Sequence, residues 1–158
     1  MRMDTNTAQL AQINAHKTAI RRFRGISAPM KVLLAHNMIG DSTVNCTVLD
    51  YGCGRGEDAD QLKFQKYDPY FFPDIPKDKF DIVVCNYVLN VLPVEEQDVL
   101  VSKILAKVKA GGKAFITVRR DVKKEGFTPK GTFQRNVTLD CPVFFEKKGQ
   151  YCIYEIAN

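Results

Sequence analysis

Residues 48–56 read Val-Leu-Asp-Tyr-Gly-Cys-Gly-Arg-Gly, and this stretch constrains the fold more than any other part of the chain. A short apolar strand ends in a carboxylate, and glycine then recurs at every second position before an acidic helix start at Glu57. Glycines lack the side-chain bulk that keeps a ligand away from the backbone, and they mark the first strand-to-helix turn of many open α/β sheets. We therefore expect a parallel sheet that binds a ligand where its strands end.

Strand and helix patterns alternate through residue 118, and strand patterns alone follow. The expected strands are 47–50, 66–68, 80–85, 114–118, 137–139, 143–146 and 151–156. The expected helices are 5–24, 28–36, 57–62 and 94–110, the last with apolar residues at helical spacing and a stop at Gly111 and Gly112. This order predicts an open α/β sheet with helices on both faces, N-terminal helices and a C-terminal antiparallel hairpin turning at 147–150.

The length and composition are those of one globular domain. The 158 residues are 45% hydrophobic and 26% charged, which is enough to bury a core. The five cysteines have no CxxC spacing and the chain has two histidines, so we expect no metal site, and reduced thiols in a cytoplasmic protein. No apolar run is long enough to span a bilayer, so no membrane partner is expected.

The net charge of +5 is unevenly distributed. Residues 1–36 carry six basic side chains and one acidic one, whereas the remainder has 17 of each sign. Such a segment suits an anionic partner such as nucleic acid. A solvated helix face explains five charges equally well, and both interpretations stay open.

The glycine loop separates two classes of ligand. A dinucleotide site uses Gly-x-Gly-x-x-Gly and leaves the helix N-terminus free for pyrophosphate. Here the third glycine comes one residue earlier, and Glu57 and Asp58 occupy the helix start. With Asp50 they would repel a phosphate and suit a cationic ligand such as S-adenosylmethionine. Asp68, at the end of the next strand, is placed to accept ribose hydroxyls, which NAD enzymes also do, so it does not discriminate.

At these residues the chain resembles class I S-adenosylmethionine-dependent methyltransferases. The matching pieces, in that family's order, are residues 48–56, Asp68, residues 80–86 and residues 111–116. A closer similarity is to the methyltransferase group associated with DNA phosphorothioation, carried by residues 16–20, 27–29, 50–58, 67–70 and 87–91. The resemblance implies a Rossmann-like sheet and transfer of a methyl group from S-adenosylmethionine.

The resemblance also implies the site residues. Asp50 would hold the amino end of the methionine, Asp68 the ribose, and Asn86 would border the methyl-transfer pocket. The candidate cofactor-binding residues are Asp50, Tyr51, Gly52, Cys53, Gly54, Asp68, Pro69, Asp74 and Asn86. The catalytic residue is unknown, with Asn86 and Tyr87 as candidates. For Tyr87, Asn90 and His16 a structural role is the favoured interpretation.

One segment departs from the family pattern. The family places a helix and a further strand between Asp68 and Phe80, but Pro69, Pro73 and Pro76 exclude both here. We therefore expect a sheet that is trimmed at this edge and lacks the usual adenine contact. Tyr70, Phe71 or Phe72 would then cover the adenine ring and Asp74 would reach its amino group, unless these aromatic residues only cap the sheet edge.

The sequence thus predicts residues 1–158 as a single methyltransferase domain, with a basic helical segment (1–46), a cofactor-binding core (47–118) and C-terminal strands (119–158). The acceptor is unidentified. Nucleic acid is a candidate from the basic residues Arg21, Arg22, Arg24, Arg119, Arg120, Lys123 and Lys124. The chain has no room for a target-recognition domain, so a partner subunit is expected to supply one. The alternatives are a non-catalytic S-adenosylmethionine-binding subunit that regulates a partner, and a nucleotide-binding oxidoreductase.

Overall fold

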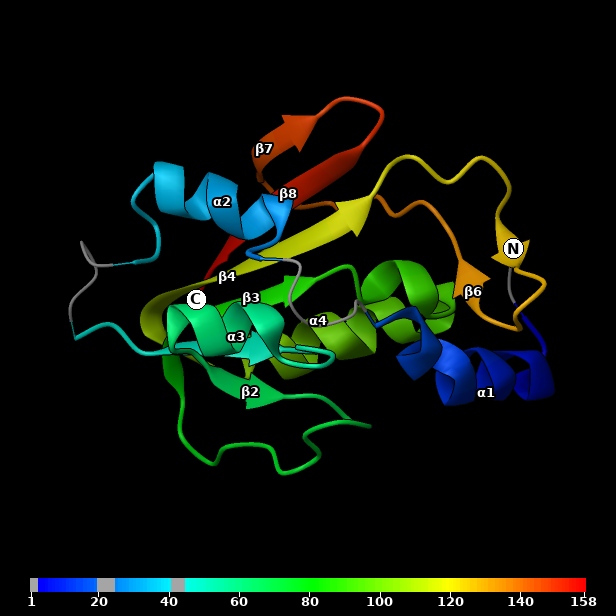
Figure 1. Ribbon diagram of the computed structural model, residues 1–158, viewed down its shortest axis with the longest axis horizontal. Coiled ribbons are helices and arrows are strands. Elements are labelled where there is room, and N and C mark those ends of the chain that lie inside the picture. Colours follow the sequence, from blue (N-terminus) through cyan, green and yellow to red (C-terminus); the bar gives the residue numbers. More distant parts are fainter. Residues whose placement is uncertain (1–2, 20–24, 41–44) are drawn as a thin grey trace.

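The computed structural model describes residues 3–19, 25–40 and 45–158, and a six-stranded sheet forms their centre (Figure 1). The strand order is β2-β1-β3-β4-β8-β7. The first four strands are parallel, whereas β8 is antiparallel to both β4 and β7. The strand bounds are β1 Val48–Tyr51, β2 Gln65–Tyr67, β3 Phe80–Asn86, β4 Val108–Arg119, β7 Val143–Lys147 and β8 Tyr151–Ala157. The expected sheet and its C-terminal hairpin are confirmed.

Alternate residues of the strands fill two separate cores because side chains of a strand point to opposite faces in turn. Val83 and Cys85 of β3 belong to one core, which the helix α4 (Gln97–Leu105) covers. Ile82 and Val84 belong to the other core, which α2 (Ala28–Ala35) and the end of α3 (Glu57–Leu62) cover. Helices therefore cover both faces, as the alternating pattern predicts.

The N-terminal segment is less helical than expected. The helix α1 spans Thr5–Asn14, and Asp4 caps it by accepting a hydrogen bond from the Thr7 backbone N–H. The 3-10 turn η1 (Ala15–Thr18) follows and Ala19 is extended, so the expected helix over 5–24 is interrupted after residue 18, and residues 20–24 lie outside the described residues. The helix α2 begins after Ser27, as predicted.

The expected helix over 94–110 is wrong in its second half. The 3-10 turn η4 (Val94–Glu96) leads into α4, which ends at Leu105. Val108 instead begins β4 and pairs with Phe80, whose N–H donates to the Lys107 carbonyl. Gly112 also lies within the strand, at a bulge where a Cβ would come within 2.6 Å of the Asp81 carbonyl oxygen. Sheet pairing thus outweighs the helical spacing of these residues.

The segment between β4 and β7 also differs from expectation. Residues 137–139 form no strand, although Val137 and Leu139 are buried in the α4-side core. The strands here are β5 (Gly126–Phe127) and β6 (Phe133–Gln134), which pair in a separate ribbon. The Leu139 N–H is satisfied by the Tyr154 hydroxyl instead of a strand partner.

The trimmed edge of the sheet is confirmed. β2 is the last strand on its side, and residues 68–79 contain no helix or strand, only a single bridge between Asp68 and Phe72. Across the three described ranges, no helix has the length and apolar character needed to cross a membrane.

Candidate functional site

A cavity of about 780 Å³ lies where β1, β2 and β3 end, on the side that the glycine loop faces. This size is typical of small-molecule sites, which are about 300–1,000 Å³. Residues 12–19 and 25–28 of the N-terminal segment border the cavity, as do the loop after β3 and part of α4. The parallel order of β2, β1 and β3 is what brings these strand ends together.

The glycine loop is held by hydrogen bonds from its own backbone. The N–H groups of Gly52 and Cys53 both donate to the Tyr67 carbonyl, at 2.7 and 3.0 Å. The Gly54 N–H donates to Asp68 Oδ2 at 2.9 Å. These three donors are therefore occupied and are not available to hold a phosphate.

Both the backbone conformation at position 52 and the limited space around it require a glycine there. Its φ of 81° lies in the left-handed region that favours glycine. A Cβ at this position would collide with Cγ2 of Val88, a residue that lines the cavity. The absence of a side chain therefore lets the loop after β3 close against the loop after β1.

Asp50, at the end of β1, is a buried carboxyl group that lines the cavity and has no hydrogen bond to any described residue. Desolvation by burial, together with the negative charges of the nearby Asp58 and Asp68, raises its pKa from 3.8 to about 8. A cation in the cavity would favour the charged form and remove this penalty. The arrangement thus favours a positively charged ligand group beside Asp50.

Asp68, at the end of β2, accepts three backbone hydrogen bonds. Oδ1 accepts from the N–H groups of Tyr70 and Phe71, at 2.9 and 3.0 Å, and Oδ2 accepts from Gly54. The carboxylate therefore fixes both the turn that follows it and the glycine loop. Each carboxylate oxygen can accept about two hydrogen bonds, so Oδ2 retains capacity for a ligand hydroxyl.

Polar groups without partners continue the site beyond β3. Both amide atoms of Asn86 and the hydroxyl of Thr117 are buried and have no hydrogen-bond partner in the described structure. The next residue, Tyr87, has a φ of 59°, which is rare for a bulky side chain. Burial raises the pKa of Tyr87 to about 12, so its hydroxyl stays protonated at neutral pH. Unpaired polar atoms and backbone strain are both concentrated at functional sites.

Two long-range contacts hold the N-terminal segment over the cavity, and sequence patterns gave no signal for either. Asp58 of α3 accepts from the backbone N–H of Ser27 at 2.7 Å and from its hydroxyl at 2.6 Å. The ring of His16 stacks on the ring of Tyr70, with centroids 3.8 Å apart and an angle of 10° between the planes. Asp58 therefore serves as a partner for Ser27 as well as contributing negative charge.

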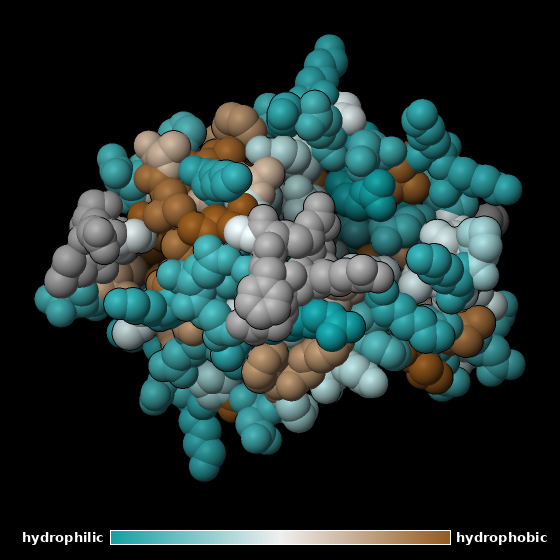
Figure 2. Space-filling view, viewed as in Figure 1, coloured by the Kyte–Doolittle hydropathy of each residue, from teal (hydrophilic) through white to brown (hydrophobic). Residues whose placement is uncertain are grey.

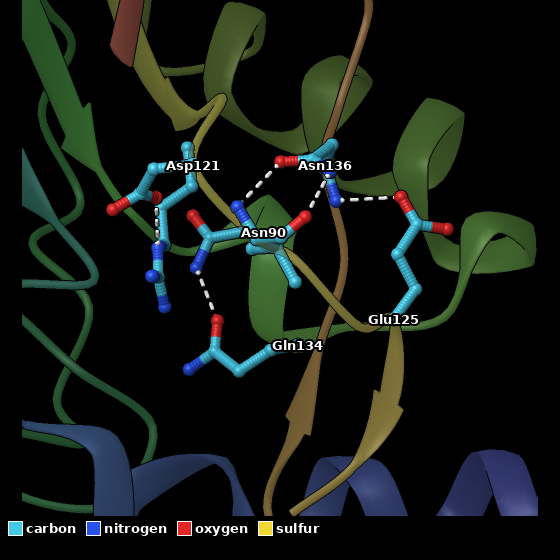
Figure 3. Close-up of polar contacts among 7 residues, drawn as sticks. Asn90, Asp121, Glu125, Gln134 and Asn136 are labelled. Carbon is cyan, nitrogen blue, oxygen red and sulfur yellow. Dashed lines mark hydrogen bonds and ion pairs between the residues drawn. The ribbon is translucent and has the colours of Figure 1, made fainter. Parts of the chain in front are cut away.

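A polar cluster joins the loop after β3 to the β5–β6 ribbon (Figure 3). Asn90 Nδ2, in the 3-10 turn η3 (Leu89–Val91), donates to Gln134 Oε1 of β6 at 3.1 Å. Asn136 binds the segment before β5 by accepting from the Val122 N–H and donating to the Val122 carbonyl. The β5–β6 ribbon thus holds in place a loop that lines the cavity.

Eight of the nine residues expected to bind the cofactor line this cavity, and they are Asp50, Tyr51, Gly52, Cys53, Gly54, Asp68, Pro69 and Asn86. Asp74 is not among the lining residues, and its side chain is exposed. Of the three aromatic residues after Asp68, Tyr70 lines the cavity, whereas Phe72 packs under the Lys66 ammonium group at 4.5 Å. The candidates Tyr87 and His16 also line it.

The basic residues considered for nucleic-acid binding are only partly described. Arg2, Arg21, Arg22 and Arg24 lie outside the described residues. Arg119 donates to Asp121 at 2.7 Å, and Arg120 donates to the Tyr154 hydroxyl at 2.5 Å. Among the described residues, no group of three or more His, Cys, Asp or Glu side chains is arranged to hold a metal ion.

Comparisons with known proteins point to one family. A model of the methyltransferase domain matches residues 18–148. The 1,6-didemethyltoxoflavin-N1-methyltransferase of Burkholderia thailandensis, solved with S-adenosylhomocysteine, is 16% identical, with a TM-score of 0.52 over 96% of this chain and 80% of that chain. The magnesium protoporphyrin IX methyltransferase of Synechocystis PCC 6803 is 14% identical, with a TM-score of 0.47 over 98% and 85%. No curated protein sequence matches the chain.

Proposed function

The chain belongs to this methyltransferase-domain family, and we propose that its cavity binds S-adenosylmethionine for methyl transfer to an acceptor beside Tyr87. One observation carries the proposal: Asp50 is a buried carboxyl group that lines the cavity next to the glycine loop and has no hydrogen-bond partner among the described residues. An uncompensated buried carboxyl group is costly, and a ligand ammonium group would offset that cost.

The site fits S-adenosylmethionine better than a dinucleotide. Tyr67 and Asp68 already occupy the backbone N–H groups of Gly52, Cys53 and Gly54, so these donors cannot hold a pyrophosphate. Asp58 and Asp68 place negative charge at the cavity, and Asp50 adds to it when it ionises, which disfavours phosphates and favours cations. These features argue against a nucleotide-binding oxidoreductase. The Burkholderia thailandensis enzyme, which holds S-adenosylhomocysteine, shares the overall fold and supports the same class of cofactor.

Each residue has a defined role in this proposal. S-adenosylmethionine, when bound, supplies a methyl group activated by its sulfonium. Asp50 binds the ammonium end, and Oδ2 of Asp68 accepts from a ribose hydroxyl while keeping its bond to Gly54. Asn86 offers an unpaired amide to the acceptor side. Tyr87 is a hydrogen-bond donor and not a base, because burial raises its pKa to about 12. Positioning of the acceptor is therefore the main contribution of the protein.

We propose nucleic acid as one class of acceptor, supported by the charge of the N-terminal segment and the exposed Lys123 and Lys124. Phosphate contacts would make binding fall steeply with salt. We expect the affinity for a DNA or RNA oligonucleotide to drop at least tenfold between 50 and 200 mM salt (about 10³-fold or more for six phosphate contacts). Weak binding that does not respond to salt would direct the search to small acceptors. A partner subunit would supply target recognition.

We also infer a relation to the methyltransferase group associated with DNA phosphorothioation. Its support is that the resembling pieces meet around one cavity. His16 from the first piece stacks on Tyr70 from the fourth, and Ser27 from the second is bound by Asp58 from the third. A direct test is fluorescence anisotropy with matched duplexes that do and do not carry a phosphorothioate. Equal binding to both would count against the relation.

Calorimetry with ligand-free protein tests the proposed function. We expect S-adenosylhomocysteine to bind the native protein, Asp50→Asn to weaken binding at pH 8, and Asp78→Asn, at an exposed position outside the cavity, to leave it unchanged. Absence of binding would contradict the proposal. Transfer of a labelled methyl group to DNA, RNA or a lysate then distinguishes an enzyme from a non-catalytic cofactor-binding subunit.

A further inference from the structure

Two segments far apart in the sequence meet beside the Tyr87 side of the cavity. β4 is parallel to β3, so Arg119 at the end of β4 lies at the end of the sheet that carries the cavity. β8 runs antiparallel to β4 and pairs Tyr151 with Arg119, which brings the β7–β8 turn to the same end. The Arg120 N–H donates to the Gln150 carbonyl at 2.9 Å. The segment after β4 therefore starts next to the β7–β8 turn.

The two segments together carry more positive than negative charge. Residues 119–125 and 146–148 contain six basic and three acidic side chains. Each acidic side chain has a partner, and the pairs are Asp121 with Arg119 at 2.7 Å, Glu146 with Arg120 at 4.0 Å and Glu125 with the Asn136 N–H at 3.0 Å. Four exposed lysines form no ion pair with any described residue, and they are Lys123, Lys124, Lys147 and Lys148. Figure 2 shows hydrophilic side chains over both segments.

The strand register directs the charges of the β7–β8 hairpin to opposite faces of the sheet. Lys147 pairs with Tyr151, and residues directly opposite each other in antiparallel strands share a face. Tyr151 packs in the core that α2 covers, so Lys147 lies on that face, as does Asn86 at the end of β3. Glu146 lies on the other face, near Arg120. The face that leads to the cavity therefore receives the lysine and not the carboxylate.

A row of aromatic rings connects this part of β7 with the cavity. Phe145, two residues before Lys147 and on the same face, has its ring centroid 6.0 Å from that of Tyr151. The Tyr151 ring in turn meets the Tyr87 ring edge-on, with centroids 6.5 Å apart, and Tyr87 lines the cavity. Phe145 and Tyr87 are only half-buried. Exposed cations next to aromatic rings are the combination with which proteins bind single-stranded nucleic acid, through phosphate contacts and base stacking.

The surface fits a single strand better than other anionic partners. The four lysines are exposed on a loop, at the end of a strand and in a turn, so they form no enclosed site for one phosphate. No large apolar side chain is exposed in residues 119–124 or 146–150, whereas insertion into a membrane surface needs such groups. A base in a duplex would have to leave its stack to reach Tyr87, and a base of a single strand would not.

We propose that single-stranded nucleic acid binds along this surface, with Lys123, Lys124, Lys147 and Lys148 contacting its phosphates. The inference rests on the proposed function, because it names the form of the acceptor and the surface that holds it. The row from Phe145 to Tyr87 then leads the bases toward the cavity. The four lysines do not line the cavity, so strand binding and cofactor binding can be measured separately.

Fluorescence anisotropy with labelled single strands of DNA and of RNA tests the assignment. We expect the double variants Lys123→Gln/Lys124→Gln and Lys147→Gln/Lys148→Gln each to weaken binding about tenfold at low salt. Each should also reduce the slope of log affinity against log salt by about 1.4, because one phosphate contact to a single strand contributes about 0.7. Lys77→Gln/Lys79→Gln is the matched control, since it removes two exposed lysines just before β3, at the opposite end of the sheet. It should change neither quantity.

Several outcomes would overturn the assignment. They are absence of binding to either strand, equal affinities of the native protein and both cavity-side double variants, and tighter binding to a duplex, to polyglutamate or to vesicles of an anionic phospholipid. Calorimetry with S-adenosylhomocysteine distinguishes these outcomes from failure of the proposed function. All three double variants should bind this ligand as the native protein does, which also shows that they are folded. Failure of the native protein to bind it contradicts the proposed function, whereas loss of strand binding alone leaves that function intact.

Discussion

Asn86 and Thr117 are paired in register across β3 and β4, yet their side-chain polar atoms are buried without a hydrogen-bond partner in the described structure. Leaving buried polar groups unpaired costs about 1–3 kcal/mol each, so the fold carries this cost at the edge of the cavity. A bound acceptor or cofactor group that pairs with the amide would offset it. Of the two residues, Asn86 lines the cavity, so a ligand that pairs with its amide should raise the stability of the protein.

We expect Asn86→Leu to leave the free energy of unfolding unchanged or to raise it by about 1 kcal/mol, because it removes an unpaired amide of similar size. Methyl transfer should fall at the same time. Asn90→Leu is the matched control, because Asn90 is also buried but only its Oδ1 lacks a partner among the described residues, whereas its Nδ2 donates to Gln134. Loss of that hydrogen bond should lower stability by about 1 kcal/mol. Urea unfolding of both variants measures the difference. Equal destabilisation by both would show that Asn86 is paired in solution.

The raised pKa of Asp50 predicts a pH dependence with a definite sign. The carboxyl group is protonated in the folded protein below about pH 8, but ionised in the unfolded chain above 3.8. Rising pH therefore favours the unfolded state across this window, by up to about 1.4 kcal/mol per pH unit. We expect the unfolding free energy of the native protein, minus that of Asp50→Asn, to fall between pH 5 and 8 and then to level off. A difference that is flat over this range would contradict the shift.

The same titration predicts how ligand affinity changes with pH. An ammonium group binds the ionised form of Asp50, and the ionised fraction grows about tenfold per pH unit below the pKa. The affinity for S-adenosylhomocysteine should therefore rise between pH 6 and 7.5, with release of a proton on binding. Calorimetry in buffers of different ionisation enthalpy measures that proton. Asp50→Asn should bind without proton release.

Short-range sequence patterns were sufficient to predict much of the fold. The helix at 57–62 and the strand at β1 follow from local spacing around the glycines, and the three prolines correctly excluded a strand after Asp68. Val108 was misassigned because its helical spacing is genuine, but pairing with Phe80 stabilises the strand instead. Local pattern cannot weigh a partner that lies 28 residues away.

The site was predictable where it is built from consecutive residues. The glycine loop and Asp68 could be identified because each follows a strand, and parallel strands end at one edge. The contacts of Ser27 with Asp58 and of His16 with Tyr70 could not, since no periodicity links residues so far apart in the chain. Asp74 was selected for its charge and its distance from Asp68, but the turn fixed by Asp68 leaves it exposed outside the cavity.

Gly52→Ala should lower the free energy of unfolding by more than the left-handed backbone conformation at this position alone explains. The left-handed conformation costs a non-glycine residue about 1–2 kcal/mol, and the new Cβ would also collide with Val88. Gly149→Ala isolates the first cost, because Gly149 has a φ of 71° and open space around it. We expect thermal unfolding to show a loss of about 1 kcal/mol for Gly149→Ala and a clearly larger loss, with weaker ligand binding, for Gly52→Ala. Similar losses would mean that Val88 moves aside freely.

Arg135 is expected to position the cavity wall without touching a ligand. It is buried, donates to the Leu92 carbonyl and to Gln97 Oε1, and its own N–H donates to the Asn90 carbonyl. Arg135→Met should lower stability by about 1–3 kcal/mol and speed hydrogen exchange in residues 89–97. Lys130→Met, an exposed cation on the same ribbon, should change neither. Unaltered exchange in the loop would remove Arg135 from this role.

The two hydrogen bonds between Ser27 and Asp58 predict energetic coupling between the N-terminal segment and α3. Hydrogen bonds to a charged group contribute about 1.5–3 kcal/mol, and only the one to the Ser27 hydroxyl is removed by Ser27→Ala. A double-mutant cycle of Ser27→Ala and Asp58→Asn should therefore give a coupling free energy of about 1 kcal/mol in urea unfolding. Ser102→Ala, on the exposed side of α4, serves as the uncoupled reference for Asp58→Asn. Because Ser27 and Asp58 both line the cavity, Ser27→Ala and Asp58→Asn should each also weaken the binding of S-adenosylhomocysteine. Strict additivity of Ser27→Ala and Asp58→Asn would show that the segment is not held over the cavity by this contact.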